Sequence, residues 1–353
     1  MRERVISTLA AILCVLCAAP SHAEPVKAEI APDGTVTVPS FKLPPSIYLS
    51  DAAKKALPRK AEDDGGTWWA QTASQHKAAE VRARIVKDSA SHVAKLRDTY
   101  SVRIEETTIA GIHAYRVIPA HSRPGTILIN LPGGGFLLGN AGGNGLMESI
   151  PVAGLSRIEV ISIDYRQAPE ATFPAASEDV AGVYRQLLKR YRPRGIGIFG
   201  CSAGGLLTAQ SLAWFEEEHL PMPGAAGIFC ASADARWGGD SWNWQKPLEG
   251  FATAPSLDER FYYGNHDLSD PLISPIESPK ILSRFPPTLL ITATRAAELS
   301  SAVTTHRLLV KAGVDADLNV WDGLGHGFFY DSDLPESREA FQVMTNFFVK
   351  HLH

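Results

Sequence analysis

The sequence predicts an α/β fold in which helices flank a mixed, mostly parallel sheet of about eight strands, with a helical or irregular cap. Two observations predict it. Short apolar runs alternate along most of the chain with segments of helical periodicity, which is the pattern of successive βαβ units. The first two runs, 101–109 and 112–119, are too close for a helix between them, so we expect them to pair as an antiparallel edge.

The first 23 residues have the pattern of a secretory signal peptide. They begin with Arg2 and Arg4, continue with an apolar run over 5–19, and end on the small residue Ala23. The alternative, a membrane anchor, would need an apolar run of roughly 20 residues, which is longer than the run observed. We therefore expect cleavage after Ala23 and a periplasmic or secreted protein with no stable membrane anchor.

An extended arm and helices are expected before the first strand. Residues 24–45 are rich in proline and polar side chains, which predicts an arm. Residues 48–99 show helical periodicity that places Val81, Ile85 and Leu96 near one face.

The later strand-like runs are separated by helical patterns. The runs cover 125–131, 158–165, 195–200, 225–231, 287–294 and 316–322. The helical patterns cover 145–156, 174–191, 203–218, 301–312 and 335–351. Strands joined through helices should lie parallel to one another.

One long segment interrupts this alternation. Residues 232–285 are too many for a plain loop and are rich in aromatic side chains, so we interpret them as an inserted cap that packs against the N-terminal helices. The chain then divides into an N-terminal arm with cap helices at 24–100 and a main domain at 101–353 that contains the insertion.

Composition excludes several classes of protein. With 45% hydrophobic and 20% charged residues among 353, the chain is globular with a large core. Its net charge of −4 offers no basic field for nucleic acid. Two of the four cysteines lie in the predicted signal peptide, which leaves Cys201 and Cys230; the sequence predicts no disulfide framework and leaves open whether these two pair.

The stretch GCSAGG places Ser202 in a G-x-S-x-G motif. An apolar strand leads into the motif and a helix leads out of it, which is typical of a nucleophile elbow that presents the central side chain above a sheet. Ser202 would be at the tip of this turn, whereas Cys201 points elsewhere. The alternative is a glycine-rich turn with a capping serine.

A serine nucleophile also needs a base, an acid and a site for the oxyanion. His326 lies in a glycine-rich loop after the last strand, and Glu298 is the only carboxylate in the segment that follows the strand before it. The order Ser, acid, His is the one expected for such a turn. The alternative is that Glu298 only stabilises the N-terminus of the helix beginning near Ser301. In that case the acid would be Asp322, or the site would be a Ser–His dyad without an acid.

The stretch LPGGGFLLG after an apolar strand predicts the oxyanion site. We expect backbone N–H groups of Gly133, Gly134 and Ala203 to bind the oxyanion. Phe136 and Trp237 are expected to line the acyl site.

These motifs resemble the hormone-sensitive-lipase-like esterases of the α/β-hydrolase fold. The resemblance covers most of the chain from about Thr108 onward and also includes DYRQAPEATFPAA, SDPLISPI, FPPTLLITATR and GLGHGF. It implies hydrolysis of carboxylic esters with no metal and no organic cofactor, with a cap over the acyl pocket. Pro132 stands where the family usually has histidine, Cys201 where it commonly has aspartate, and Ala296 where the acid is usually found.

The sequence therefore predicts a serine carboxylesterase that acts on small-molecule esters with short to medium acyl chains. The competing interpretations are a ligand-binding protein on a hydrolase scaffold with little or no turnover, and a hydrolase of another acyl bond, such as an amide, carbamate or lactone. The sequence leaves open whether two copies form a homodimer.

Overall fold

A computed structural model describes residues 27–40, 42–62, 77–248 and 260–353. The predicted signal peptide lies outside these residues, and export stays a prediction. None of the described helices is both long and apolar enough to cross a membrane. The chain divides into two compact units, Met1–Pro44 and Pro45–His353. In the first, β1 (Glu29–Ile30) and β2 (Val36–Thr37) pair as a short antiparallel ribbon with exposed side chains.

The second unit contains an eight-stranded sheet in the order β10-β9-β8-β7-β5-β6-β4-β3. Its strands are β3 (Val102–Ile109), β4 (Ile112–Pro119), β5 (Ile127–Leu131), β6 (Glu159–Ile163), β7 (Ile196–Cys201), β8 (Ala225–Phe229), β9 (Thr288–Ala293) and β10 (Ala316–Trp321). The strands β5 to β10 run parallel, while β3 and β4 form the antiparallel edge, as the sequence predicted. The carboxyl ends of the parallel strands therefore share one edge of the sheet, where ligands bind in open α/β folds.

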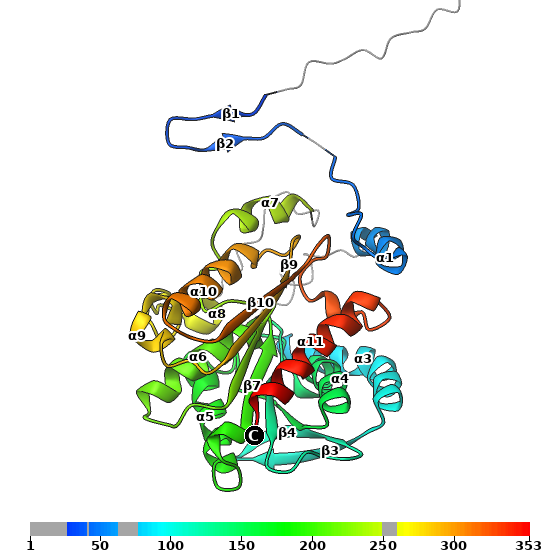
Figure 1. Cartoon of the computed structure of the whole chain (residues 1–353), viewed down its shortest axis with the longest axis vertical. Helices are drawn as coiled ribbons and strands as arrows, with labels where there is room; N and C mark the ends of the chain where they lie inside the picture. Colours follow the sequence, from blue (N-terminus) through cyan, green and yellow to red (C-terminus); the bar gives the residue numbers. More distant parts are fainter. Residues whose placement is uncertain (1–26, 41, 63–76, 249–259) are drawn as a thin grey trace, which may run out of the picture. The chain divides into compact units, whose positions relative to one another are not determined.

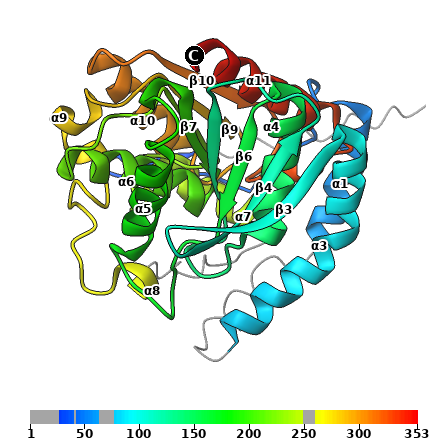
Figure 2. The ribbon, with the colours of Figure 1, turned by 90° about the horizontal axis from the view of Figure 1, so that it is seen from below.

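Helices cover both faces of this sheet (Figures 1 and 2). The main helices are α1 (Asp51–Glu62), α3 (Ala78–Tyr100), α4 (Leu146–Ser156), α5 (Ala175–Leu187), α6 (Ala203–Glu217), α10 (Leu299–Lys311) and α11 (Pro335–His351). One face packs against α5, α6 and α10, and the other packs against α4 and α11. The five helices predicted after the first strands are all present.

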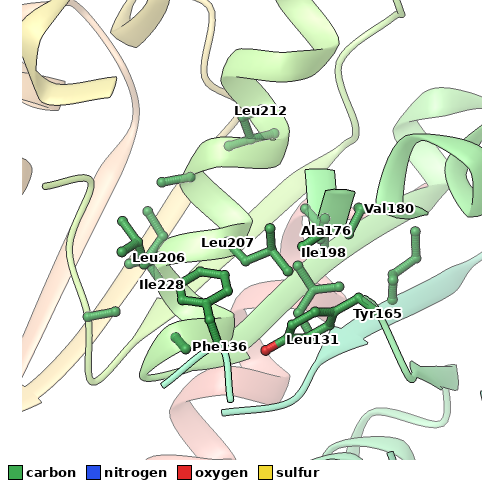
Figure 3. Close-up of a cluster of buried hydrophobic side chains, with 14 of the residues drawn as sticks. Leu131, Phe136, Tyr165, Ala176, Val180, Ile198, Leu206, Leu207, Leu212 and Ile228 are labelled. Atoms are coloured by element: carbon green, nitrogen blue, oxygen red, sulfur yellow. The ribbon is translucent and has the colours of Figure 1, made fainter. Parts of the chain in front are cut away.

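The core depends on strands that are buried on both faces. Every side chain of β5, β7 and β8 is buried, as expected where helices cover a parallel sheet on both sides. Figure 3 shows part of the layer between the sheet and the first helical face, where Leu206 and Leu207 of α6 meet Ile198 and Ile228 of the sheet.

The predicted cap region contains three short α-helices in its described part: α7 (Asp240–Leu248), α8 (Arg260–Tyr263) and α9 (Pro279–Leu282). In α7, the Ser241 hydroxyl donates to Ala297 O at 2.7 Å, which fixes this helix to the start of α10. In α8, Tyr262 O accepts the Phe173 N–H at 2.8 Å. The described part of the insertion thus packs on elements of the sheet domain; residues 249–259 lie outside the described residues.

Arg82 attaches α3 to two loops at the carboxyl edge of the sheet. Its Nε donates to Leu137 O and its Nη2 to Ala168 O, both at 2.8 Å. The same guanidinium pairs with Glu170 at 2.7 Å. The N-terminal helix therefore supports the loop that follows β5, and the inward face predicted for Val81 and Ile85 packs against the core.

We expect Arg82→Ala to lower the free energy of unfolding by about 2 kcal/mol, because it leaves two backbone acceptors near the core without their donors. Urea unfolding followed by circular dichroism measures the change. Arg84→Ala is the matched control on the same helix: Arg84 is 80% exposed and pairs only with Asp88 in the described structure, so its loss should cost less than about 0.5 kcal/mol. Equal effects of the two substitutions would contradict the role given to Arg82.

Candidate active site

Ser202 occupies a strained turn between β7 and α6. Its backbone has φ 58° and ψ −125°, a conformation that non-glycine residues rarely adopt. The turn packs tightly against β5: a Cβ atom at Gly200 would lie 2.2 Å from Leu131 O, and one at Gly204 would lie 1.8 Å from it, so only glycine fits at either position. The Ser202 N–H donates to Phe229 O at 2.8 Å. This geometry leaves the serine side chain partly exposed at the carboxyl edge of the sheet.

Cys201, the neighbour of Ser202, is fully buried, and burial raises the pKa of its thiol well above the usual range. Cys201 and Cys230 are both free thiols. A buried thiol that stays protonated is a poor nucleophile. The structure thus presents the serine, and not the cysteine, to the carboxyl edge.

Glu298 and His326 lie on two different loops, and their side chains are within ion-pair distance of each other. The Oε2 atom of Glu298 lies 2.9 Å from His326 Nδ1, and its Oε1 accepts the Thr292 hydroxyl at 3.1 Å. Glu298 is fully buried, whereas the His326 side chain is 35% exposed. A buried carboxylate in this position holds a histidine in the tautomer with Nδ1 protonated, which leaves Nε2 as the acceptor.

The alternatives considered for the acid do not match this geometry. Glu298 is the first residue of the turn into α10, but its side chain makes no hydrogen bond to the helix N-terminus. Asp322 accepts the hydroxyls of Thr294 and Ser46 instead of contacting the His326 ring. Glu298 is thus the carboxylate that the structure places against the His326 ring.

The loop carrying His326 is fixed beside the turn carrying Ser202, because both bind the end of β8. Ser202 contacts Phe229 O, as described, and the Gly327 N–H donates to Cys230 Sγ at 3.3 Å. A partly exposed serine, a histidine and a buried carboxylate brought to one edge are the combination that activates a hydroxyl as a nucleophile. No cluster of His, Cys, Asp or Glu within the described ranges is arranged to hold a metal ion.

The loop after β5 lies directly against this turn. A Cβ atom at Gly133 would be 3.3 Å from Ser202 Cβ. However, the Gly133 N–H donates to Glu148 Oε1 at 3.2 Å. The Gly133 N–H is therefore already engaged in this structure, and its predicted role as an oxyanion donor stays a prediction.

The next N–H groups of the loop are differently placed. Gly134 has φ 141° and Gly135 has φ 61°, conformations that favour glycine and turn the chain sharply after Gly133. In the part of the chain that the structure describes, the N–H groups of Gly134, Gly135 and Ala203 donate to no protein acceptor. The predicted donors Gly134 and Ala203 thus remain, and Gly135 joins them as a candidate.

Glu148 is a buried carboxylate beneath this loop, and sequence reasoning missed it. Its Oε1 accepts the Tyr330 hydroxyl at 2.5 Å as well as the Gly133 N–H, and its Oε2 accepts Asn130 Nδ2 at 2.7 Å. Burial raises the pKa of Glu148 to about 7, although these hydrogen bonds lower it. The available sequence signal was that Glu148 is the only charged residue in helix α4.

The two predicted substrate contacts have different surroundings. Trp237 is 8% exposed, its ring centroid lies 6.2 Å from that of His326, and its indole N–H is buried with no acceptor among the described residues. Phe136 is 3% exposed and stacks on Tyr262 at 4.6 Å, within the core cluster of Figure 3. Trp237 therefore lies beside the histidine, while Phe136 packs inward; contact of either with substrate stays a prediction.

Comparisons with known proteins agree with this architecture. Residues 128–330 match the model of an α/β-hydrolase fold family. An acetyl-hydrolase of Streptomyces hygroscopicus is 30% identical over 245 residues, which cover 68% of this chain and 80% of that protein. The crystal structure of one esterase is 31% identical in sequence and superposes with a TM-score of 0.77; the match covers 90% of this chain and 99% of that esterase. The structure of an esterase from the bacterial hormone-sensitive lipase family is 26% identical and superposes with a TM-score of 0.68; this match covers 78% of this chain and 98% of that esterase. The chain therefore belongs to the α/β-hydrolase family and, within it, to the hormone-sensitive-lipase-like branch.

Proposed function

We propose that the protein is a serine carboxylesterase that hydrolyses small-molecule esters through an acyl-enzyme on Ser202. The observation that carries the proposal is the contact of 2.9 Å between the buried Glu298 carboxylate and His326 Nδ1, on a loop fixed beside the turn of Ser202. The relatives named as esterases and as an acetyl-hydrolase support the same reaction.

In the first half-reaction, Ser202 Oγ bonds to the ester carbonyl carbon while its proton passes to His326 Nε2. The carbonyl oxygen becomes an oxyanion, and Glu298 stabilises the imidazolium. Collapse of this intermediate breaks the bond to the alcohol, which leaves with the proton from Nε2. A water molecule then attacks the acyl-enzyme by the same route and releases the acid.

The oxyanion needs hydrogen-bond donors that are not already engaged. The N–H groups of Gly134 and Ala203 meet this condition, together with that of Gly135. The Ala203 N–H also lies at the N-terminus of α6, where the helix favours negative charge. This assignment leaves out Gly133, whose N–H is donated to Glu148.

The folded protein should react covalently with a fluorophosphonate probe, because the probe needs the same activated serine as an ester. Intact-mass spectrometry should show one adduct and peptide mapping should place it on Ser202, whereas Ser202→Ala should show none while keeping the wild-type circular dichroism. Cys201→Ser should still be labelled. A folded wild-type protein that takes up no probe would instead indicate a binding protein without turnover.

We expect Glu298→Gln to lower kcat by about 10²- to 10⁴-fold, because the amide neither fixes the tautomer of His326 nor stabilises its charged form. The matched control is Asp322→Asn, which removes the other nearby carboxylate and should keep kcat within about threefold of wild type. Steady-state hydrolysis of p-nitrophenyl butyrate measures both. The reverse result, with Asp322→Asn inactive and Glu298→Gln active, would move the acid to Asp322.

Esters with short and medium acyl chains should be hydrolysed fastest. The Streptomyces relative is named for acetyl groups, and in this chain the ring centroid of the buried Trp237 lies 6.2 Å from that of His326. A series of p-nitrophenyl esters from acetate to palmitate, measured below the critical micelle concentration, tests the preference. Faster turnover of palmitate than of butyrate would contradict it.

A further inference from the structure

A buried network below the proposed site is not used by the mechanism above. Glu148 is 2% exposed and lies on α4, which carries none of the proposed catalytic residues. Burying a carboxylate is unfavourable unless several donors compensate it. Glu148 receives the Gly133 N–H, the Tyr330 hydroxyl and the Asn130 amide, and the backbone of Cys201 also stabilises its ionised form. Asn130 is held in turn by the Ser162 hydroxyl, which donates to its Oδ1 at 2.7 Å.

Side chains provide the contacts that hold the loop after β5 at Pro132 and Gly133. Pro132 has no N–H, and its carbonyl accepts the Tyr165 hydroxyl at 2.6 Å. The Gly133 carbonyl accepts Asn144 Nδ2 at 3.0 Å, and its N–H goes to Glu148. Glu148 is the charged member of this set. Because Gly134 follows directly, the direction of the Gly133 peptide sets where the next N–H groups point.

The same carboxylate contacts the segment that carries the histidine. Tyr330 lies four residues after His326, and its N–H donates to Gly327 O at 3.0 Å. Its hydroxyl, besides donating to Glu148, interacts with the thiol of Cys201, which also interacts with the thiol of Cys230. Cys230 accepts the Gly327 N–H at 3.3 Å. A continuous chain of contacts thus joins the oxyanion loop, the residue before Ser202 and the residue after His326.

We propose that Glu148 and Tyr330 are positioning residues for ester hydrolysis: the carboxylate fixes the Gly133 peptide so that the Gly134 and Gly135 N–H groups face the oxyanion, and the tyrosine ties this loop to the His326 turn. The inference rests on the proposed function. Neither residue touches the substrate. Their effect is expected on the transition state, because the oxyanion forms only there.

The protonation state of Glu148 gives this arrangement a distinct signature. The titratable groups facing Glu148 are Tyr330, Cys201 and Tyr165, and burial raises the pKa of each well above its usual range, so they stay neutral near pH 7. Glu148, in contrast, has a pKa of about 7 and therefore changes its protonation state near neutral pH. Its ionised form is the stronger acceptor for the Gly133 N–H. Loop positioning should therefore weaken as the pH falls through about 7.

The experiment compares Glu148→Gln and Tyr330→Phe in the full-length protein with p-nitrophenyl butyrate. Both variants should lower kcat by about 10- to 100-fold and leave KM within about twofold, as expected when donors that act in the transition state are misplaced. The control is Tyr184→Phe. Tyr184 is also buried and donates its hydroxyl to a carbonyl, that of Pro221, at 2.8 Å, but it lies on α5, outside the proposed site. Its kcat should match wild type.

The pH profile separates positioning from a general loss of packing. The comparison is the ratio of the kcat/KM values of wild type and Glu148→Gln, two proteins that differ in this one side chain. That ratio should decrease as the pH falls from about 8 to 6, because only the wild type loses an ionised Glu148. Tyr330→Phe keeps the Glu148 carboxylate, so its kcat/KM should decrease as the pH falls, as it does in the wild type.

Wild-type kcat in folded Glu148→Gln and Tyr330→Phe, or a pH-independent ratio, would overturn the inference. So would a loss of kcat in Tyr184→Phe equal to that in Tyr330→Phe. If Glu148→Gln does not fold, the kcat of Tyr330→Phe, which removes a single hydroxyl, decides. These outcomes are distinct from failure of the proposed function, which would appear as wild-type protein without esterase activity or as full activity in Ser202→Ala.

Discussion

The contact between the turn at Ser202 and the end of β5 sets the geometry of the carboxyl edge. Gly200 and Gly204 both approach Leu131 O so closely that neither position has room for a Cβ atom. This approach lets the backbone reverse within one residue and raises the serine above the sheet. It also places the loop that starts at Pro132 against Ser202, because that loop begins where the contact ends. The nucleophile and the oxyanion donors are therefore positioned by one packing constraint.

Much of the fold could be predicted because its signals are local. The central strands β5, β7 and β8 are apolar runs with clear boundaries, and the tight connection between β3 and β4 required antiparallel pairing. Glu298 could be found by elimination, since no other carboxylate lies in its segment. Its contact of 2.9 Å with His326 is a matter of tertiary structure, because the two residues lie on loops that follow different strands.

The parts that could not be predicted depend on pairs that are distant in sequence. Glu148 and Tyr330 are 182 residues apart, and neither belongs to a motif. The contact of the Gly133 N–H with Glu148 could not be read from the glycine motif, because it depends on this distant carboxylate. The departures at Pro132 and Cys201 acquire a physical meaning in the same region. The proline gives no N–H to the loop, and the buried cysteine thiol interacts with Tyr330 and Cys230.

The attachment of α3 through Arg82 bears on where this protein can be divided. Judged by the sheet alone, a chain beginning at Val102 contains every strand of the main sheet and all proposed catalytic groups. Such a chain would nevertheless expose the carbonyls of Leu137 and Ala168 and the apolar surface that α3 covers. The helix is thus part of the folding unit. An N-terminal segment taken from a related enzyme has to contain an arginine equivalent to Arg82 to keep the loop after β5 in place.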